Sequence, residues 1–316
     1  MRPCAIGILP PSHSGDLDLL VAAGKAGELG ILRASASPGL VKNQIRRMSE
    51  PLGTRFGVQV TLRSLDATVA ALESLGNRVD LILISGELSA LELAGCVGTL
   101  RRHCTRIFRE AVSEDEAEAA LKAGVDGLVA KGNEAGGRVG SETLFVLLQR
   151  LCSRFPIPVW AFGGIGPHVA AACRAAGAQG IVLQDEVTLA EECWTPEPLR
   201  SRLAAMDGTE TLCLGESLNY RYRVHRQEGA EWIRELQQME SRGADREIFV
   251  RRLEEISETI AEPGLYPMGQ GIAFAARLAA RHRNLAGILR AYRSQAADNL
   301  RLQASHPALV ENSDFA

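Results

Sequence analysis

The sequence is poor in lysine and lacks several motifs that mark large enzyme classes. Of its 35 basic residues only four are lysines, namely Lys25, Lys42, Lys122 and Lys131. It has no P-loop, no Gly-x-Gly-x-x-Gly after the first expected strand and no Ser-His-Asp arrangement. The net charge of -3 makes nucleic acid an unexpected partner.

Signals for metals, disulfides and membranes are also missing. The seven cysteines are scattered, with no C-x-x-C pair and no histidine at metal-ligand spacing. No segment approaches ~20 uncharged apolar residues, and the apolar run before Pro10 is too short for the core of a signal peptide. We therefore expect a cytoplasmic protein with reduced cysteines, no metal site and no membrane partner.

The most informative stretch is the glycine-rich segment 131–140, which directly follows the apolar run Gly127–Ala130. Glycines here let the main chain approach a flat or anionic ligand without interference from Cβ atoms. Lys131, Glu134 and Arg138 place charge at the same point. A turn with solvated charges is the alternative interpretation of this pattern.

A second glycine cluster, residues 163–166, lies between the apolar run Ile157–Phe162 and an alanine-rich helical pattern. Glycines between a strand and a helix N-terminus offer free N–H groups to a phosphate. Two strand ends thus carry candidate ligand loops.

Short apolar runs, each followed by a helical pattern, alternate along residues 1–206. The runs are Cys4–Leu9, Gly30–Arg33, Phe56–Thr61, Val79–Ser85, Thr105–Phe108, Gly127–Ala130, Ile157–Phe162 and Gly180–Leu183. This alternation predicts the α/β class, and eight βα units in ~200 residues predict a closed (β/α)8 TIM barrel. Sites in that fold lie on the loops after the strands, where both glycine clusters fall.

Two helix starts can be read from the sequence. Ser113 precedes the pattern Glu114–Ala123 and predicts a capping box with Glu116. Ser141 is expected to open a helix that runs through Leu151.

The pattern changes after the barrel region. We expect a barrel over residues 1–206, a helical extension over 207–303 that packs over the barrel mouth, and a linker or tail over 304–316. A short strand or hairpin is expected within Thr211–Val224. A chain that stops in a linker suggests the first piece of a longer protein, such as a megasynthase.

At this point the residues resemble a known family. The segments Gly127–Gly140, Gly163–Pro167 and Pro267–Gln270, in that order, look like the nitronate monooxygenase (2-nitropropane dioxygenase) family of FMN-dependent (β/α)8 barrels. The run Asp126–Gly140, with Phe145–Arg150 after it, is similar to the nitronate monooxygenase-like domains at the N-terminus of some type I polyketide synthases.

The resemblance implies where FMN would bind. Its phosphate would lie on the Gly163-Gly164 loop and on the loop after the eighth strand, which contains Gln184. Its ring would lie over the barrel mouth near Ile8 and Leu9.

The remaining implied ligand contacts come from other loops. Gln59 would bring a polar side chain to the flavin ring, and Lys131 stands where the family often has a glutamine. Gly136 and Gly137 would let the main chain approach the cofactor. Gln270 matches a late Gly-Gln of the family that folds back over the site.

The chain departs from the family pattern in two places. Arg138 stands where the family's catalytic histidine usually is, and arginine cannot act as a general base at neutral pH. The loop after the eighth strand, where a Gly-Thr or Gly-Ser pair normally meets the phosphate, contains Asp185 and Glu186. Two carboxylates beside a phosphate disfavour its binding.

Three hypotheses follow. In the first, the chain is a flavin oxidoreductase in which Lys131 and Arg138 hold positive charge near FMN, and Arg138 also holds the oxyanion of an enoyl-thioester-like acyl substrate. NADPH or NADH is the candidate electron donor, and an acyl carrier protein or another polyketide synthase domain is the candidate partner.

In the second hypothesis, the barrel has lost FMN and serves as a docking or structural domain, with the charged helices between Ala230 and Ile260 as its partner surface. In the third, it is a nitronate monooxygenase with a displaced base. His13, in the first βα loop, is the better-placed replacement, and His168 is the other.

Overall fold

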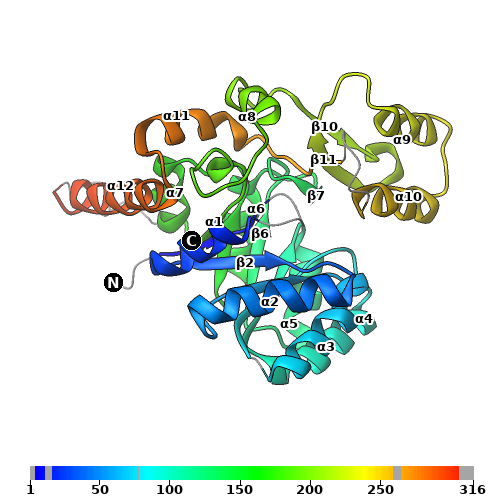
Figure 1. The fold of residues 1–316 in the computed structure, drawn as a ribbon, viewed down its shortest axis with the longest axis horizontal. Helices are drawn as coiled ribbons and strands as arrows, with labels where there is room; N and C mark the ends of the chain where they lie inside the picture. Colours follow the sequence, from blue (N-terminus) through cyan, green and yellow to red (C-terminus); the bar gives the residue numbers. More distant parts are fainter. Residues whose placement is uncertain (1–3, 11–15, 77, 259–264, 306–316) are drawn as a thin grey trace.

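The computed structural model describes residues 4–10, 16–76, 78–258 and 265–305. Parallel strands form a closed barrel in the order β1-β2-β3-β4-β5-β6-β8-β9 (Figure 1). They are β1 (Ala5–Ile8), β2 (Leu29–Arg33), β3 (Gly57–Val60), β4 (Val79–Ile84), β5 (Cys104–Ala111), β6 (Gly127–Lys131), β8 (Val159–Phe162) and β9 (Gly180–Leu183). Each overlaps one predicted run, which confirms the (β/α)8 barrel.

Helices follow the barrel strands and surround them. They are α1 (Leu17–Lys25), α2 (Pro38–Leu52), α3 (Leu65–Leu75), α4 (Ala90–Leu100), α5 (Glu114–Ala123), α6 (Leu144–Arg154) and α7 (Pro167–Ala175). The strands are buried on both faces. In β4, Leu81 and Leu83 pack inside the barrel, whereas Ile82 and Ile84 pack in the outer core that holds the helices. Burial on both faces explains why β4 is a continuous apolar run.

Two aromatic rings pack against each other in the barrel interior. Phe108 and Trp160 contact each other edge to face, with centroids 5.2 Å apart. Their registered neighbours, Gly127 and Gly180, have no room for a side chain, since a Cβ there would lie 2.5 Å from Phe108 and 2.6 Å from Trp160. The interior is therefore packed, and the site is expected on the loops after the strands, as in other (β/α)8 barrels.

The helix starts differ from the sequence expectations. Ser113 accepts a hydrogen bond from the Glu116 N–H (3.3 Å), but the Glu116 carboxylate accepts from Val112 instead of completing a box. Helix α6 begins at Leu144, three residues after Ser141, and the Leu144 N–H donates to the Glu134 carboxylate (2.9 Å). The predicted start at Ser141 is therefore wrong.

Residues 207–303 contribute strands as well as helices. The elements after the barrel are α8 (Glu197–Ala204), β10 (Thr211–Leu214), β11 (Arg221–His225), α9 (Glu231–Ser241), α10 (Arg246–Glu258), α11 (Ile272–His282) and α12 (Leu285–Ser305). Strands β10 and β11 pair antiparallel, which confirms the expected hairpin. Strand β11 also pairs with β7 (Gly137–Val139), a strand inside the segment that we expected to be a loop. The domain boundaries themselves stay a prediction.

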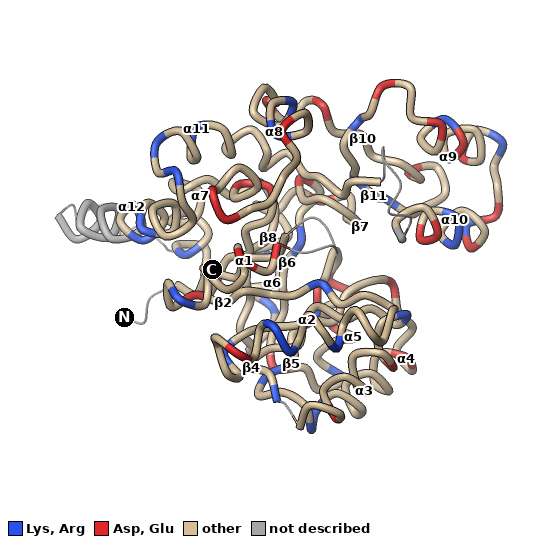
Figure 2. Tube along the Cα trace, in the orientation of Figure 1, with Lys and Arg blue, Asp and Glu red and all other residues tan. Residues whose placement is uncertain are grey.

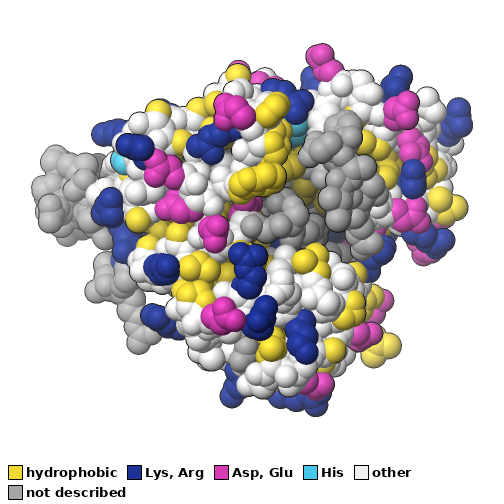
Figure 3. Space-filling model, viewed as in Figure 1, with side chains coloured by type: hydrophobic (Ala, Val, Ile, Leu, Met, Phe, Trp, Pro, Cys, Tyr) yellow, Lys and Arg dark blue, Asp and Glu magenta, His cyan; other side chains and the backbone are white. Residues whose placement is uncertain are grey.

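The extension reaches two sides of the barrel. Helix α12 packs against α7 and α1, whereas β10, β11, α9 and α10 form a separate lobe on the opposite side (Figure 1). Acidic and basic residues both occur along α9 and α10 (Figure 2), and both signs are interspersed on the visible face (Figure 3). Helix α12 includes residues 304 and 305 of the expected tail, and 306–316 lie outside the described residues.

Within the described ranges, no helix has the length and apolar character needed to span a bilayer. Nor does any group of three or more metal-ligating side chains occur in that part of the chain.

Candidate active site

A buried, hydrogen-bonded group of side chains lies where β3, β5 and β6 end, and we call Gln59, Glu110 and Lys131 the lysine cluster. Glu110 accepts from Gln59 Nε2 at Oε1 (2.6 Å) and from Lys131 Nζ at Oε2 (3.4 Å). The three residues are only 3–4% exposed. The structure thus brings together two predicted site residues, Gln59 and Lys131, through a carboxylate that the sequence analysis did not single out.

The ammonium group of Lys131 has two stabilising neighbours. Burial lowers the pKa of Lys131, the Glu110 carboxylate acts to raise it, and the charge of Arg33 acts to lower it again. Nζ also lies 4.9 Å from the ring centroid of Phe162. A cation held in this way can interact strongly with negative charge on a ligand at the mouth, because water is excluded.

Arg138 is held by a partner on a neighbouring helix. Its guanidinium forms a two-pronged ion pair with Glu116 of α5, and Arg109 Nη2 lies 3.7 Å from the same carboxylate. Burial acts to raise the pKa of Glu116, but the hydrogen bonds and charge of Arg138 outweigh it and the pKa is lowered. Arg138 is therefore neutralised within the protein, which limits its availability to a ligand.

The loops after β8 and β9 form a second charged feature. The Glu186 carboxylate accepts from the N–H groups of Ile165 (2.9 Å) and Gln184 (3.0 Å). We call these two N–H groups the amide cluster. Gly163 (φ 138°) and Gly164 (φ 57°) provide the left-handed turn that leads to Ile165, a backbone path that only glycine follows readily.

Two further polar side chains of this region are incompletely paired. Asp185 Oδ2 accepts from the Gly269 N–H (2.9 Å), and Gln184 Nε2 donates to the Pro267 carbonyl (2.8 Å). Asp185 Oδ1 and Gln184 Oε1 are buried with no hydrogen-bond partner among the residues that the structure describes. Burial, and then the charge of Glu186, raise the pKa of Asp185 well above its ordinary value.

Residues 267–270 cross the mouth against the glycine-rich loop. The Gln270 N–H donates to the Glu134 carbonyl (2.8 Å), but the Gln270 side chain is exposed. A Cβ on Gly136 would lie 2.6 Å from the Pro267 carbonyl oxygen, and one on Gly137 would lie 3.7 Å from Lys131 Nζ. The late segment therefore returns to the site as expected, with its backbone in contact and the Gln270 side chain outside.

The end of β1 contributes less than expected. Leu9 is buried in the barrel interior and donates its N–H to the Leu183 carbonyl (3.0 Å). The Ile8 side chain packs in the outer core with the helices, and the expected position of Ile8 beside the ring stays a prediction. His13 lies outside the described residues.

The residues that sequence analysis missed at the site are acidic or basic side chains within apolar stretches. Glu110 and Arg109 lie at the end of β5, which extends beyond the predicted run Thr105–Phe108. Charged residues inside a buried strand of a parallel barrel are unusual unless they are paired. This rule could have identified Arg109 and Glu110 from the sequence. Glu116 gave no such signal because acidic residues are common in a first helical turn.

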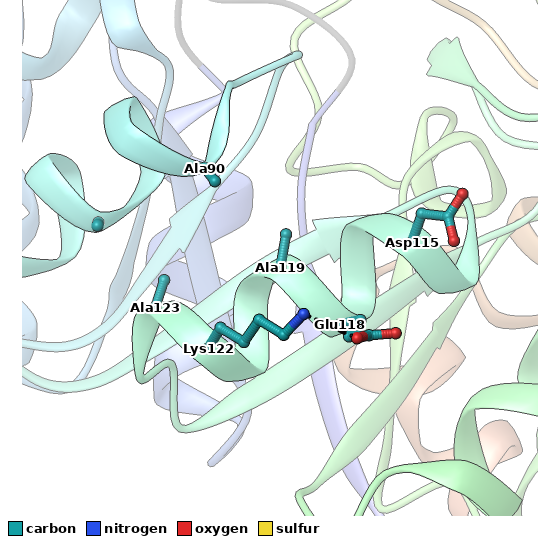
Figure 4. Close-up of a pocket in the computed structure, with 7 residues that line it drawn as sticks. Ala90, Asp115, Glu118, Ala119, Lys122 and Ala123 are labelled. Carbon is teal, nitrogen blue, oxygen red and sulfur yellow. Dashed lines mark hydrogen bonds and ion pairs between the residues drawn. The ribbon is translucent and has the colours of Figure 1, made fainter.

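Surface grooves occur away from the mouth. One of about 400 Å³ lies between α4 and α5, lined by Ala90, Ala119 and Lys122 (Figure 4). Lys122 Nζ there is paired with Glu118 Oε1 (2.8 Å). Another of about 1180 Å³ lies between α6 and α7 near the start of β8. None of the lining residues belongs to the lysine cluster or the amide cluster.

Comparison with known proteins identifies the family. The family model described as nitronate monooxygenase matches residues 96–283, more than half of the chain. The chain belongs to the nitronate monooxygenase family. A curated relative, Rv1533 of Mycobacterium tuberculosis, carries a provisional monooxygenase name and is 27% identical over 219 residues. That match covers 65% of this chain and 55% of the relative, so it spans about half of the relative's length.

Solved structures of other proteins share the fold. FabK from Thermotoga maritima superposes with a TM-score of 0.79 at 21% identity, covering 96% of each chain. Nitroalkane oxidase from Streptomyces ansochromogenes has a TM-score of 0.73 at 21% identity, covering 94% of this chain and 96% of that one. The enoyl reductase domain of MlnA from Bacillus amyloliquefaciens has a TM-score of 0.66 at 13% identity, covering 96% and 95%.

Nitronate monooxygenases are flavin-dependent, so FMN is the group against which the residues at the mouth are compared. The donor set at the mouth suits FMN. Lys131 and Gln59 offer a cation and an amide for the ring, and the amide cluster suits two oxygens of a phosphate. In this structure, however, the amide cluster is bonded to the chain's own Glu186 carboxylate.

Proposed function

We propose that the chain is an FMN-dependent oxidoreductase that reduces an acyl substrate of the enoyl-thioester type, with NADPH or NADH as electron donor. The substrate would be presented by an acyl carrier protein or another domain of a polyketide synthase. Two observations support this proposal. The run Asp126–Gly140, with Phe145–Arg150 after it, resembles domains of such synthases, and a protein with the same fold is the enoyl reductase domain of MlnA from a macrolactin cluster.

The observation that carries the proposal is the buried Lys131 ammonium group, held by Glu110 at the ends of β5 and β6. Addition of a hydride to an enoyl thioester places negative charge on the thioester oxygen. A fixed cation in a site without water stabilises such charge far better than a solvated one. Glu110 and Gln59 would hold Lys131 in position before the substrate arrives.

The electron balance assigns each reactant a part. FMN would supply hydride-transfer chemistry when bound, with the nicotinamide nucleotide as the source of the hydride and a proton from solvent completing the saturated product. Gln59, Lys131, Gly136 and Gly137 would hold the ring of FMN, and the loops of Gly163-Gly164 and Gln184 would hold its phosphate. These assignments remain part of the proposal.

Arg138 argues against the reaction for which the family is named. An arginine cannot accept the proton of a nitroalkane, and this one is already paired with Glu116. We infer that Arg138 holds β7 and the glycine-rich loop against α5, and that Lys131 is the cation that acts on the substrate.

The test begins with the visible spectrum of the purified protein, with released cofactor quantified and FMN added back. Enoyl-thioester reduction is then assayed with NADPH and with NADH. The variant Lys131→Met should lower kcat by roughly 10²–10³-fold if the ammonium stabilises the transition state.

The matched control is Lys122→Met, which removes a surface lysine paired with Glu118 and should leave kcat unchanged. Circular dichroism establishes that each variant is folded. A colourless protein that takes up no FMN and reduces no enoyl thioester would contradict the proposal and support a docking barrel.

A further inference from the structure

The amide cluster is a built anion site whose occupant belongs to the chain. Glu186 places one carboxylate oxygen on the Ile165 N–H (2.9 Å) and the other on the Gln184 N–H (3.0 Å). The residue is 3% exposed. Two oxygens of one anion thus take N–H groups from two different loops of the barrel.

These two loops are the ones on which (β/α)8 barrels often bind phosphate. Here they follow β8 and β9, and the left-handed glycines Gly163 and Gly164 turn the first loop so that the Ile165 N–H points to the carboxylate. A phosphate bound by the same N–H groups would need the space that the carboxylate fills. The two anions cannot occupy it together, because like charges at that separation repel strongly in a buried site.

Neighbouring elements fix the carboxylate in place. A Cβ on Gly271, at the start of α11, would lie 2.4 Å from Glu186 Oε1, so a larger residue there would displace the side chain. The Tyr292 hydroxyl donates to the Ile165 carbonyl (2.6 Å) and thereby orients that peptide. The site is therefore formed jointly by the barrel and by helices α11 and α12.

We propose that Glu186 is an internal competitor of the FMN phosphate, so that FMN binds only when the Glu186 carboxylate leaves the amide cluster. This inference rests on the proposed function only for the identity of the flavin. The expected consequence is that the phosphate of FMN adds little to its affinity for the native chain.

Riboflavin has the ring of FMN without its phosphate. Comparing the two ligands therefore distinguishes binding of the ring from binding of the phosphate. Dissociation constants of FMN and riboflavin are measured by quenching of flavin fluorescence for the full chain and for Glu186→Ala. We expect the variant to bind FMN at least ~10-fold more tightly, equivalent to about 1.4 kcal/mol, with a change of less than about 2-fold for riboflavin.

Two further variants test whether the position of the Glu186 carboxylate, and not merely the loss of a negative charge, changes the affinity for FMN. Gly271→Ala should displace the carboxylate without removing its charge, and it should tighten FMN binding in the same direction. Glu191→Ala removes an exposed carboxylate, paired with Arg283, from the segment that follows β9 and should leave both affinities unchanged.

The outcomes are distinct. If FMN binds the native chain and Glu186→Ala equally, the inference is wrong and the proposed function stands. If Glu186→Ala gains FMN affinity but neither protein reduces an enoyl thioester, the inference stands and the proposed function fails. Absence of flavin binding in every variant overturns both.

Discussion

The lysine cluster and the amide cluster, on two sides of the barrel mouth, stabilise buried charge in different ways. In the lysine cluster, the charge of Lys131 is balanced by the opposite charge of Glu110. In the amide cluster, Glu186 receives backbone N–H groups, and no ion pair to it occurs among the described residues. A charge balanced by another side chain depends on that partner, whereas a charge held by main-chain dipoles can be replaced by a ligand anion.

The first test of this difference between the two clusters is the removal of the Glu110 carboxylate. Glu110→Ala leaves the Lys131 ammonium buried without its carboxylate, so we expect the free energy of unfolding to fall by about 3–5 kcal/mol. Urea denaturation provides the measurement. Glu118→Ala, which removes an exposed partner of Lys122, should cost about 0–1 kcal/mol.

Adding Lys131→Met to Glu110→Ala should recover much of the loss, because no charge is then left unpaired. Equal losses for Glu110→Ala and Glu118→Ala would show that the lysine cluster is not a tightly coupled pair.

Removal of Glu186 should have a smaller effect. Glu186→Ala leaves the N–H groups of Ile165 and Gln184 without an acceptor, which costs about 1–3 kcal/mol. Unlike the loss at Glu110, this one should be recovered in millimolar inorganic phosphate, because an external anion can take the same N–H groups. Thermal denaturation with and without phosphate tests this, with Glu191→Ala as the exposed control. A deficit that phosphate leaves unchanged would contradict the view of the amide cluster as an anion site.

The pH dependence of the free energy of unfolding should reflect the protonation of the Asp185 carboxyl group. Burial, followed by the charge of Glu186, raises its pKa in the folded protein, which therefore keeps a proton that the unfolded chain has lost. The free energy of unfolding must then fall as pH rises above the ordinary value of 3.8, by about 1.4 kcal/mol for each unit between the two pKa values.

Asp185→Asn removes this contribution, so its stability relative to the native chain should increase as pH rises from ~5 to ~8. Urea denaturation across this range is the measurement, with the exposed Asp18→Asn as control. Parallel stability profiles for Asp185→Asn and the native chain would count against a protonated Asp185.

The smallest effect is expected at the surface of the lobe formed by α9 and α10. Arg252 forms a two-pronged pair with Glu235, but both side chains are more than 40% exposed. Arg252→Ala should change the free energy of unfolding by only about 0–1 kcal/mol. A loss as large as that of Glu110→Ala would mean that exposure is not what separates weak from strong pairs in this chain.

The barrel was predictable because its strands are buried on both faces and so appear as apolar runs, as in Leu81–Ile84. Strand β7 was not predictable, because Gly137–Val139 is short and has no apolar pattern. It forms a strand because β11, more than 80 positions later, pairs with it. The residues around β7 do not indicate a pairing strand so far along the chain.

The candidate site was predictable in part. Lys131 stood out because lysine is rare here and follows a buried strand, and the structure places it in the lysine cluster. Glu110 was missed because β5 was expected to end at Phe108. Glu186 was recognised as unfavourable for a phosphate, but its contact with Ile165 depends on the packing of two loops, which spacing alone does not specify.

The packed interior around Phe108 and Trp160 has a kinetic consequence. It leaves the loops after the strands as the place where a reactant meets the lysine cluster. A nicotinamide nucleotide and an acyl chain that need the same space beside that cluster would alternate, with the first product released before the second reactant binds. Under the proposed function, initial-rate plots at several concentrations of the second reactant should therefore be parallel lines.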